Sequence, residues 1–164
     1  MDKIRKQLKT MNRQLDFYMK HKTSMKNNFI GLLDQTFPGV NNYFRSPARE
    51  DGSQKWVDFA TTYWHVDCVR NMSRSAFINH YQNWCKRKEY NFRQSKAEEI
   101  YETAKELVPV LPKDNVTKFI VKQAARQLAD ASETVAQLKA KMNEAASKLP
   151  EYPVVMAMYG VGSS

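Results

Sequence analysis

Apolar residues recur at alternating spacings of four and three near both ends of the chain, which is the pattern of a helix with one buried face. In the first 32 residues only Lys22 interrupts the series, which comprises Ile4, Leu8, Met11, Leu15, Tyr18, Met25, Phe29 and Leu32. The second series is uninterrupted and comprises Val121, Ala124, Leu128, Ala131, Val135, Leu138, Met142, Ala145 and Leu149. Each series is a heptad seam, so the sequence predicts two long helices.

Two seams of similar length most simply pack on each other as an antiparallel hairpin. The alternative is that each seam pairs with its twin in a second copy, because a heptad specifies a partner helix without saying whose it is. A homodimer is therefore a live hypothesis. The expected seam contacts are Leu8, Met11, Leu15, Leu128, Val135, Leu138 and Met142.

The sequence between the seams predicts short helices. Pro38 and Gly39 end the first long helix, because proline disfavours helix in the residue before it and glycine supplies the turn. Aromatic residues predict a helix over residues 54–69. Ser73 is a candidate N-cap for a helix over 74–87, and Ser95 for one over 96–108, while Asp114 is a candidate cap for the second long helix.

These elements predict an all-α fold, namely a long antiparallel helical hairpin, or coiled-coil stalk, with a small helical head inserted between its two helices. We expect the first coiled-coil helix over residues 1–36, the head over 37–113 and the second coiled-coil helix over 114–150. Residues 151–164 are expected to open a further domain. Within them, residues 154–159 suit either a strand or a buried helix.

Charge favours a polyanionic partner. Twenty-six Lys and Arg against 17 Asp and Glu give a net charge of +9 and a pI near 9.5, which points to nucleic acid. Residues 1–30 hold eight Lys or Arg against two Asp, a net +6, or two-thirds of the total. The candidate contacts in this helix are Lys3, Arg5, Lys6, Lys9 and Arg13.

A second basic run combines cations with aromatic rings. Lys86, Arg87 and Lys88 are followed by Tyr90, Phe92 and Arg93, and such a combination suits phosphate contact and base stacking. The alternative is a solvated helix end, because positive residues are favourable near a helix C-terminus.

No catalytic constellation is visible. Metal-dependent nucleases need several gathered carboxylates, whereas the acidic residues 98–102 share a helix with lysines and suit a solvated face. His65 and Asp67 stand two positions apart in a predicted helix, so we expect them on different faces and interpret His65 as structural. Cys68 and Cys85 have no second pair to complete a zinc site and are expected to be buried and reduced. The sequence thus predicts no enzyme activity, metal, cofactor or small-molecule substrate for this chain.

The N-terminal stretch carries charges from residue 2 and has no signal-peptide core, so we expect a cytoplasmic protein that makes no membrane contact. At the other end, residues 158–162 have the apolar-Gly-apolar-Gly form of a helix-hairpin-helix turn, in which glycines let backbone N–H groups approach a phosphate. Gly160 and Gly162 are therefore candidate phosphate contacts. The second helix of that motif is missing, so we expect a truncation, by design or by a natural frameshift.

Four motifs in this order resemble the middle of an insertion-sequence 110 family transposase: LLDQTFPG at 32–39, KWVDF at 55–59, KAEEI at 96–100 and VMAMYGVG at 155–162. The resemblance implies an upstream RuvC-like domain with an Asp-Glu-Asp-Asp site and Mg²⁺, a coiled-coil linker, and a downstream domain that supplies a nucleophilic serine. It also implies oligomers that act on DNA with a structured guide RNA. None of the catalytic positions maps onto this chain, and Ser163 and Ser164 are not the nucleophile.

The expected function is therefore a non-catalytic coiled-coil assembly and nucleic-acid-contacting segment of a transposase, with DNA, guide RNA and a second copy as partners. The alternative is a purely structural coiled-coil dimerisation spacer without nucleic-acid affinity.

Overall fold

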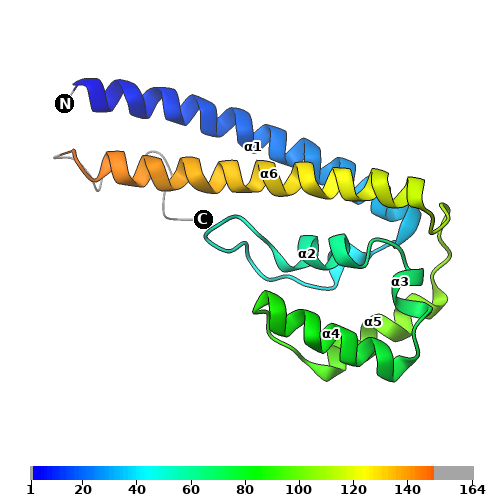
Figure 1. Cartoon of the computed structure of the whole chain (residues 1–164). Helices are drawn as coiled ribbons and strands as arrows, with labels where there is room; N and C mark the ends of the chain where they lie inside the picture. Colours follow the sequence, from blue (N-terminus) through cyan, green and yellow to red (C-terminus); the bar gives the residue numbers. More distant parts are fainter. Residues whose placement is uncertain (1, 150–164) are drawn as a thin grey trace. The chain divides into compact units, whose positions relative to one another are not determined.

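The computed structural model describes residues 2–149, and every regular element among them is helical. The all-α prediction is confirmed, and the two long helices pack against each other as a hairpin, with the short helices between them in sequence (Figure 1). The elements are α1 (Asp2–Thr36), the 3-10 helix η1 (Val40–Asn42), α2 (Lys55–Thr62), α3 (Asp67–Arg70), α4 (Arg74–Lys88), α5 (Gln94–Glu106) and α6 (Asn115–Ala146).

The described residues divide into two compact units. The stalk unit comprises residues 2–27, 48–53 and 127–149, and the head unit comprises 28–47 and 54–126. Both long helices contribute to both units, because the last turns of α1 and the first turns of α6 belong to the head unit.

Aliphatic side chains from both long helices form the core of the stalk unit. Leu8 and Leu15 of α1 pack with Val135, Met142 and Ala146 of α6, and each of them is at most 5% exposed. Other seam residues surround this core and are partly buried, namely Ile4, Met11, Tyr18, Leu138 and Ala145. The two seams therefore cover each other within one chain.

The turn over residues 48–53 also belongs to the stalk unit and lies against α6. The Arg49 N–H donates to the Ser53 carbonyl oxygen at 2.8 Å, and the Asp51 carboxylate accepts from the Ser53 N–H at 2.9 Å. Gly52 has a φ of 88°, and a Cβ there would collide with the backbone carbonyl of Ser132. Glycine is therefore required both by the left-handed backbone and by the close approach to α6.

Aromatic rings form the core of the head unit. Phe59 of α2 is fully buried, and ring centroids lie 4.5 to 6.4 Å from its own in Tyr43, Phe44, Tyr63, Tyr81 and Trp84. Such pairs add about 0.5–1.5 kcal/mol each beyond the burial of area. Two polar groups on rings of the head are satisfied: Trp84 Nε1 donates to Thr62 Oγ1 at 3.1 Å, and the Tyr101 hydroxyl donates to the Met72 carbonyl at 2.7 Å. The ring contacts and hydrogen bonds of the head core therefore fix the orientation of its side chains, in addition to burying apolar area.

Two of the predicted caps are confirmed. Ser73 Oγ accepts from the Ala76 N–H at 3.2 Å at the start of α4, and Asp114 Oδ1 accepts from the Thr117 N–H at 2.9 Å at the start of α6. The predicted Ser95 cap is wrong, because α5 begins at Gln94, two residues earlier than expected, with Arg93 as its N-cap. The reason is tertiary: the Phe92 ring packs on Tyr81, and this contact holds the chain extended up to Arg93.

The single helix predicted over residues 54–69 is also wrong. Helix α2 ends at Thr62, the backbone leaves helical geometry at Tyr63, and α3 begins at Asp67. The buried His65 ring explains the break, since its Nδ1 accepts from the Asp67 N–H at 3.0 Å and its Nε2 lies 2.8 Å from the Leu111 carbonyl oxygen. The head consequently has four α-helices and η1 rather than three helices.

Candidate nucleic-acid interface

A stripe of cations lies on the face of α1 opposite the seam. Lys6, Lys9, Arg13 and Lys20 follow one another at spacings of three, four and seven, so they share one side of the helix. All four are exposed. They extend over about 21 Å at 1.5 Å per residue. Lys20 also pairs with Asp16 at 3.0 Å. We call these four residues the basic stripe.

Phe17 lies within the basic stripe and is 61% exposed. It stands four residues after Arg13 and three before Lys20, so its ring neighbours both cations on the helix surface. Phe17 lies outside the heptad seam, so the seam pattern does not identify it. In the sequence, Phe17 can be recognised as an aromatic residue that stands outside the seam among charged positions. An exposed ring between cations suits stacking on a nucleobase.

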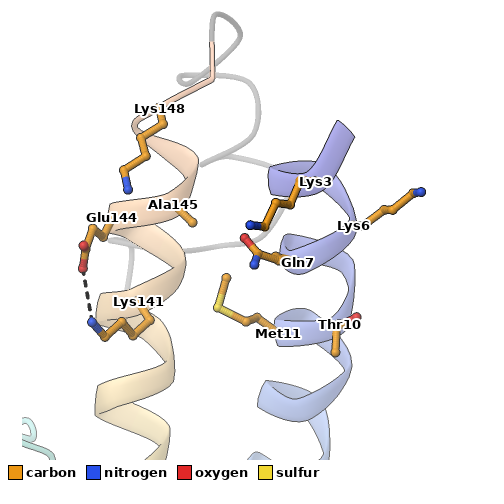
Figure 2. A pocket seen from close by; sticks show the side chains of 9 residues that line it. All are labelled: Lys3, Lys6, Gln7, Thr10, Met11, Lys141, Glu144, Ala145 and Lys148. Atoms are coloured by element: carbon orange, nitrogen blue, oxygen red, sulfur yellow. Dashed lines mark ion pairs between the residues drawn. The ribbon is translucent and has the colours of Figure 1, made fainter. Parts of the chain in front are cut away.

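A groove opens between the first turns of α1 and the last turns of α6, both within the stalk unit. It has a volume of about 730 Å³ and is lined by Lys3, Lys6, Gln7, Thr10, Met11, Lys141, Glu144, Ala145 and Lys148. In Figure 2, Lys3, Gln7 and Met11 point from α1 toward α6, whereas Lys6 points away. Ala145 leaves space because the seam carries a small residue there. The groove therefore has lysines around a floor formed in part by Met11 and Ala145.

Positive charge predominates in the groove. Four of its lining residues are lysines and one is a glutamate. Glu144 pairs with Lys141 at 3.6 Å (Figure 2). Lys6 belongs to the groove lining and to the basic stripe, so the two surfaces join at this residue. The other candidate cation of this region, Arg5, lies 3.9 Å from Asp2.

Lys22, the residue that interrupts the first seam, shows how closely cations gather in the stalk unit. Burial lowers its pKa, and the charges of Lys139 and Lys26 lower it further. Like charges disfavour the protonated lysine.

In the fold, the cations of the second basic run are separated from its aromatic rings. Lys86, Arg87 and Lys88 form the exposed last turn of α4, where cations suit the helix dipole. The neighbouring rings instead pack into the head, with Tyr90 stacked on Trp84 at 5.4 Å and Phe92 beside Tyr81 at 5.8 Å. The structure thus favours the solvated helix end for residues 86–88. Arg93 is placed apart from them, as the N-cap of α5.

His65 and Asp67 do approach each other, contrary to the expectation that they occupy different faces. His65 Nδ1 lies 3.8 Å from Asp67 Oδ2, because the chain between α2 and α3 is not helical. The His65 ring is fully buried with both nitrogens engaged, and Asp67 pairs with Arg70. These contacts are those of a structural histidine.

The two cysteines remain thiols in the head unit, with Cys85 buried and Cys68 half-buried. Burial raises the pKa of both thiols. Within residues 2–149, no group of three His, Cys, Asp or Glu side chains has a metal-binding arrangement. Gly160 and Gly162 lie outside the described residues.

No family model, curated protein or solved structure matches this chain. Over the described part of the sequence, no helix combines the length and the apolar character needed to cross a membrane.

Proposed function

We propose that this chain is a non-catalytic helical module that contacts nucleic acid through the basic stripe and the groove. The observation that carries the proposal is the continuity of these cations, which run along one face of α1 and join a lysine-lined groove at Lys6. Lysines and arginines that neutralise phosphates release condensed counterions, and this release supplies affinity without reading sequence.

The stripe suits a phosphate backbone in length and in composition. Its four cations span about 21 Å of helix, and duplex DNA carries one negative charge per roughly 1.7 Å of its axis. The exposed Phe17 ring adds a stacking surface for an unpaired base. Both features support contact with the backbone and with exposed bases more than recognition of a defined sequence.

We further propose that the module belongs to a transposase of the insertion-sequence 110 family, on the strength of the four motifs above. DNA and guide RNA would then be its partners, and Mg²⁺-dependent chemistry would reside in another domain. The reading frame around this segment tests this part. An RuvC-like domain before it and a serine domain after it would support the assignment, and unrelated neighbours would exclude it.

A coiled-coil spacer without nucleic-acid affinity is the second candidate. Its support is the mutual burial of Leu8, Leu15, Val135 and Met142, which explains a long hairpin without reference to any ligand. The spacer hypothesis gives the basic stripe no role.

Fluorescence anisotropy with labelled duplex and single-stranded DNA over a range of salt concentrations separates the two candidates. We expect binding at low salt that weakens steeply as salt is added. Replacing Lys6, Lys9 and Arg13 together by Gln should weaken low-salt affinity at least tenfold. It should also reduce the slope of log affinity against log salt by up to about 3, since each lost phosphate contact accounts for about 0.9 on duplex DNA.

The matched control replaces Lys113, Lys118 and Arg126 by Gln, which removes the same charge from exposed positions of the head unit. This control should retain most of the affinity. Equal loss in both triple variants would mean that net charge alone drives binding and that the interface is placed wrongly. An absence of binding to the unaltered chain at low salt would leave the spacer as the better explanation.

A further inference from the structure

A second hollow, in the head unit, gathers cations from three segments of the chain. It has a volume of about 480 Å³, and Arg45, Lys55, Arg93 and Lys96 line it together with the rings of Phe44 and Tyr81. The lining also includes the carboxylate of Glu99, which pairs with Lys96 at 2.8 Å. We call this hollow the head pocket. It shares no residue with the groove or the basic stripe.

Lys55 is the most unusual side chain of the head pocket, because it is only 8% exposed. Its Nζ donates to the Asn91 carbonyl oxygen at 2.9 Å and lies 4.5 Å from the centroid of the Phe44 ring. Among the described residues, no carboxylate pairs with it. Buried ammonium groups normally have an anionic partner. One carbonyl and a ring face leave donor capacity on Lys55 for an incoming anion.

Two helices begin at the head pocket with cations in their first positions. Lys55 is the first residue of α2, and Arg93 is the N-cap of α5. Neither α2 nor α5 has an N-cap side chain that accepts a backbone hydrogen bond. Helix starts are already positive, so cations are unfavourable there and anions are favourable. The arrangement therefore concentrates positive charge that an anion would compensate.

Tyr81 also lines the head pocket, and it carries a buried hydroxyl. Its side chain is fully buried, and its hydroxyl has no oxygen or nitrogen partner among the described residues. Its polar neighbour is the Cys85 thiol, which is a weak hydrogen-bonding group. An unsatisfied buried hydroxyl costs about 1–3 kcal/mol. The head pocket thus contains a buried cation without an anion, and one of its lining rings belongs to a tyrosine whose hydroxyl lacks a strong partner.

We propose that the head pocket binds a phosphate group, carried either by a small phosphate ester or by the terminal phosphate of a nucleic-acid strand. A phosphate has several acceptor oxygens for the converging donors, and arginine side chains match it with paired N–H groups. The volume of about 480 Å³ leaves room for the group that carries the phosphate.

NMR titration tests the proposal, with the backbone amides of Asn91, Arg93 and Lys96 as reporters. The probes are inorganic phosphate, a nucleoside monophosphate, and one oligonucleotide prepared with either a 5′-phosphate or a 5′-hydroxyl. We expect saturable shifts at these amides with the phosphate-bearing probes. Lys55→Met should weaken this binding at least tenfold, and its melting temperature should be unchanged or higher, because the apolar stem is kept and a buried charge is removed.

Lys118→Met is the matched control, since Lys118 is an exposed lysine of α6 outside the head pocket. It should bind the phosphate probes as the unaltered chain does. Tighter binding of the 5′-phosphate strand than of the nucleoside monophosphate would identify a strand end as the ligand, and equal binding would identify a small phosphate ester. The proposal is overturned if no probe produces saturable shifts at these amides, or if Lys118→Met loses as much affinity as Lys55→Met.

Phosphate binding in the head pocket and nucleic-acid binding by the basic stripe can be tested independently. The triple variant at Lys6, Lys9 and Arg13 should keep the phosphate-induced shifts in the head. Lys55→Met should keep the salt-dependent binding of duplex DNA.

Discussion

The stalk unit is held by aliphatic side chains without hydrogen-bonding groups, whereas the head unit is held by rings whose polar edges need partners. Leu8, Val135 and Met142 belong to the stalk core, and their heptad spacing is enough to bring them to its buried face. In the head, Tyr63 and Tyr81 surround Phe59 with phenol groups taken out of water. The stability of the stalk should therefore respond to changes of side-chain volume, and that of the head to changes of volume and of protonation.

Alkaline pH should produce the largest difference in stability between the two units. Burial raises the pKa of Tyr63 and Tyr81 far above the ordinary value, and it raises that of Cys85 as well. In the unfolded chain these groups release protons near their ordinary pKa values of about 8.5 for cysteine and 10 for tyrosine. The unfolded head then binds fewer protons than the folded head, so its stability falls as pH rises through this range.

Three lysines oppose this trend, because Lys55 and Lys122 in the head and Lys22 in the stalk have lowered pKa values. For them the unfolded state binds more protons, so each adds stability as pH rises. In the head, the pKa shifts of the tyrosines are larger than those of the lysines, so they determine how its stability changes with pH. Near-UV circular dichroism should therefore lose the ring signals of the head before the far-UV helical signal falls.

Tyr63→Phe removes one of the responsible phenols, so it should move the alkaline midpoint of the near-UV signal to higher pH. Tyrosinate absorbance that rises fully near pH 10, while the near-UV signal is retained, would contradict the assigned pKa shifts.

Truncation of one core side chain in each unit should give the next largest effects. Phe59→Ala should cost about 3–5 kcal/mol in the head, and Leu8→Ala about 2–5 kcal/mol in the stalk, from lost transfer free energy and the cavity left behind. We expect Leu8→Ala near the lower end, because this end of the stalk borders the open groove. Hydrogen exchange should show protection lost chiefly in the unit that carries the substitution. Equal loss across both units would mean that they unfold as one.

Two glycine substitutions should have smaller effects of opposite sign. Gly52→Ala in the stalk unit should destabilise by about 1–3 kcal/mol or more, because it strains a left-handed backbone and meets the carbonyl of Ser132. Gly31→Ala in the helical part of the head unit meets nothing within 4 Å. It should stabilise by about 0.5–1 kcal/mol, since alanine is the better helix former. Chemical denaturation measures both, and a neutral Gly52→Ala would show that this turn does not lie against α6.

Local patterns are enough to predict the long helices and the face that each of them buries, but they leave open whether the partner helix belongs to the same chain. The seam spacing alone identifies Leu8, Leu15, Val135 and Met142 as core residues, and the cap rules identify Ser73 and Asp114. These features depend on residues within a few positions of one another, or on one repeated spacing.

The features that could not be predicted depend on residues far apart in sequence. His65 breaks the expected helix because it reaches Leu111, 46 residues away. The head pocket needs Arg45, Lys55 and Arg93 from three separate segments. No spacing rule connects such positions. Tyr90 and Phe92 looked available for base stacking for a different reason: they follow the end of α4, and the path by which the chain turns back onto Trp84 and Tyr81 has no signal in the spacing.

Lys22 has a consequence for the register of the hairpin. A polar residue at a single seam position selects one register and one association state at some cost in stability. If two copies of α1 paired in parallel and in register, their Lys22 side chains would face each other across the seam. Within one chain, Lys22 is half-buried, and Lys139 of α6 and Lys26 place like charges near it. Lys22 therefore weakens the seam with either partner helix, and it constrains the register of the hairpin without choosing between the two.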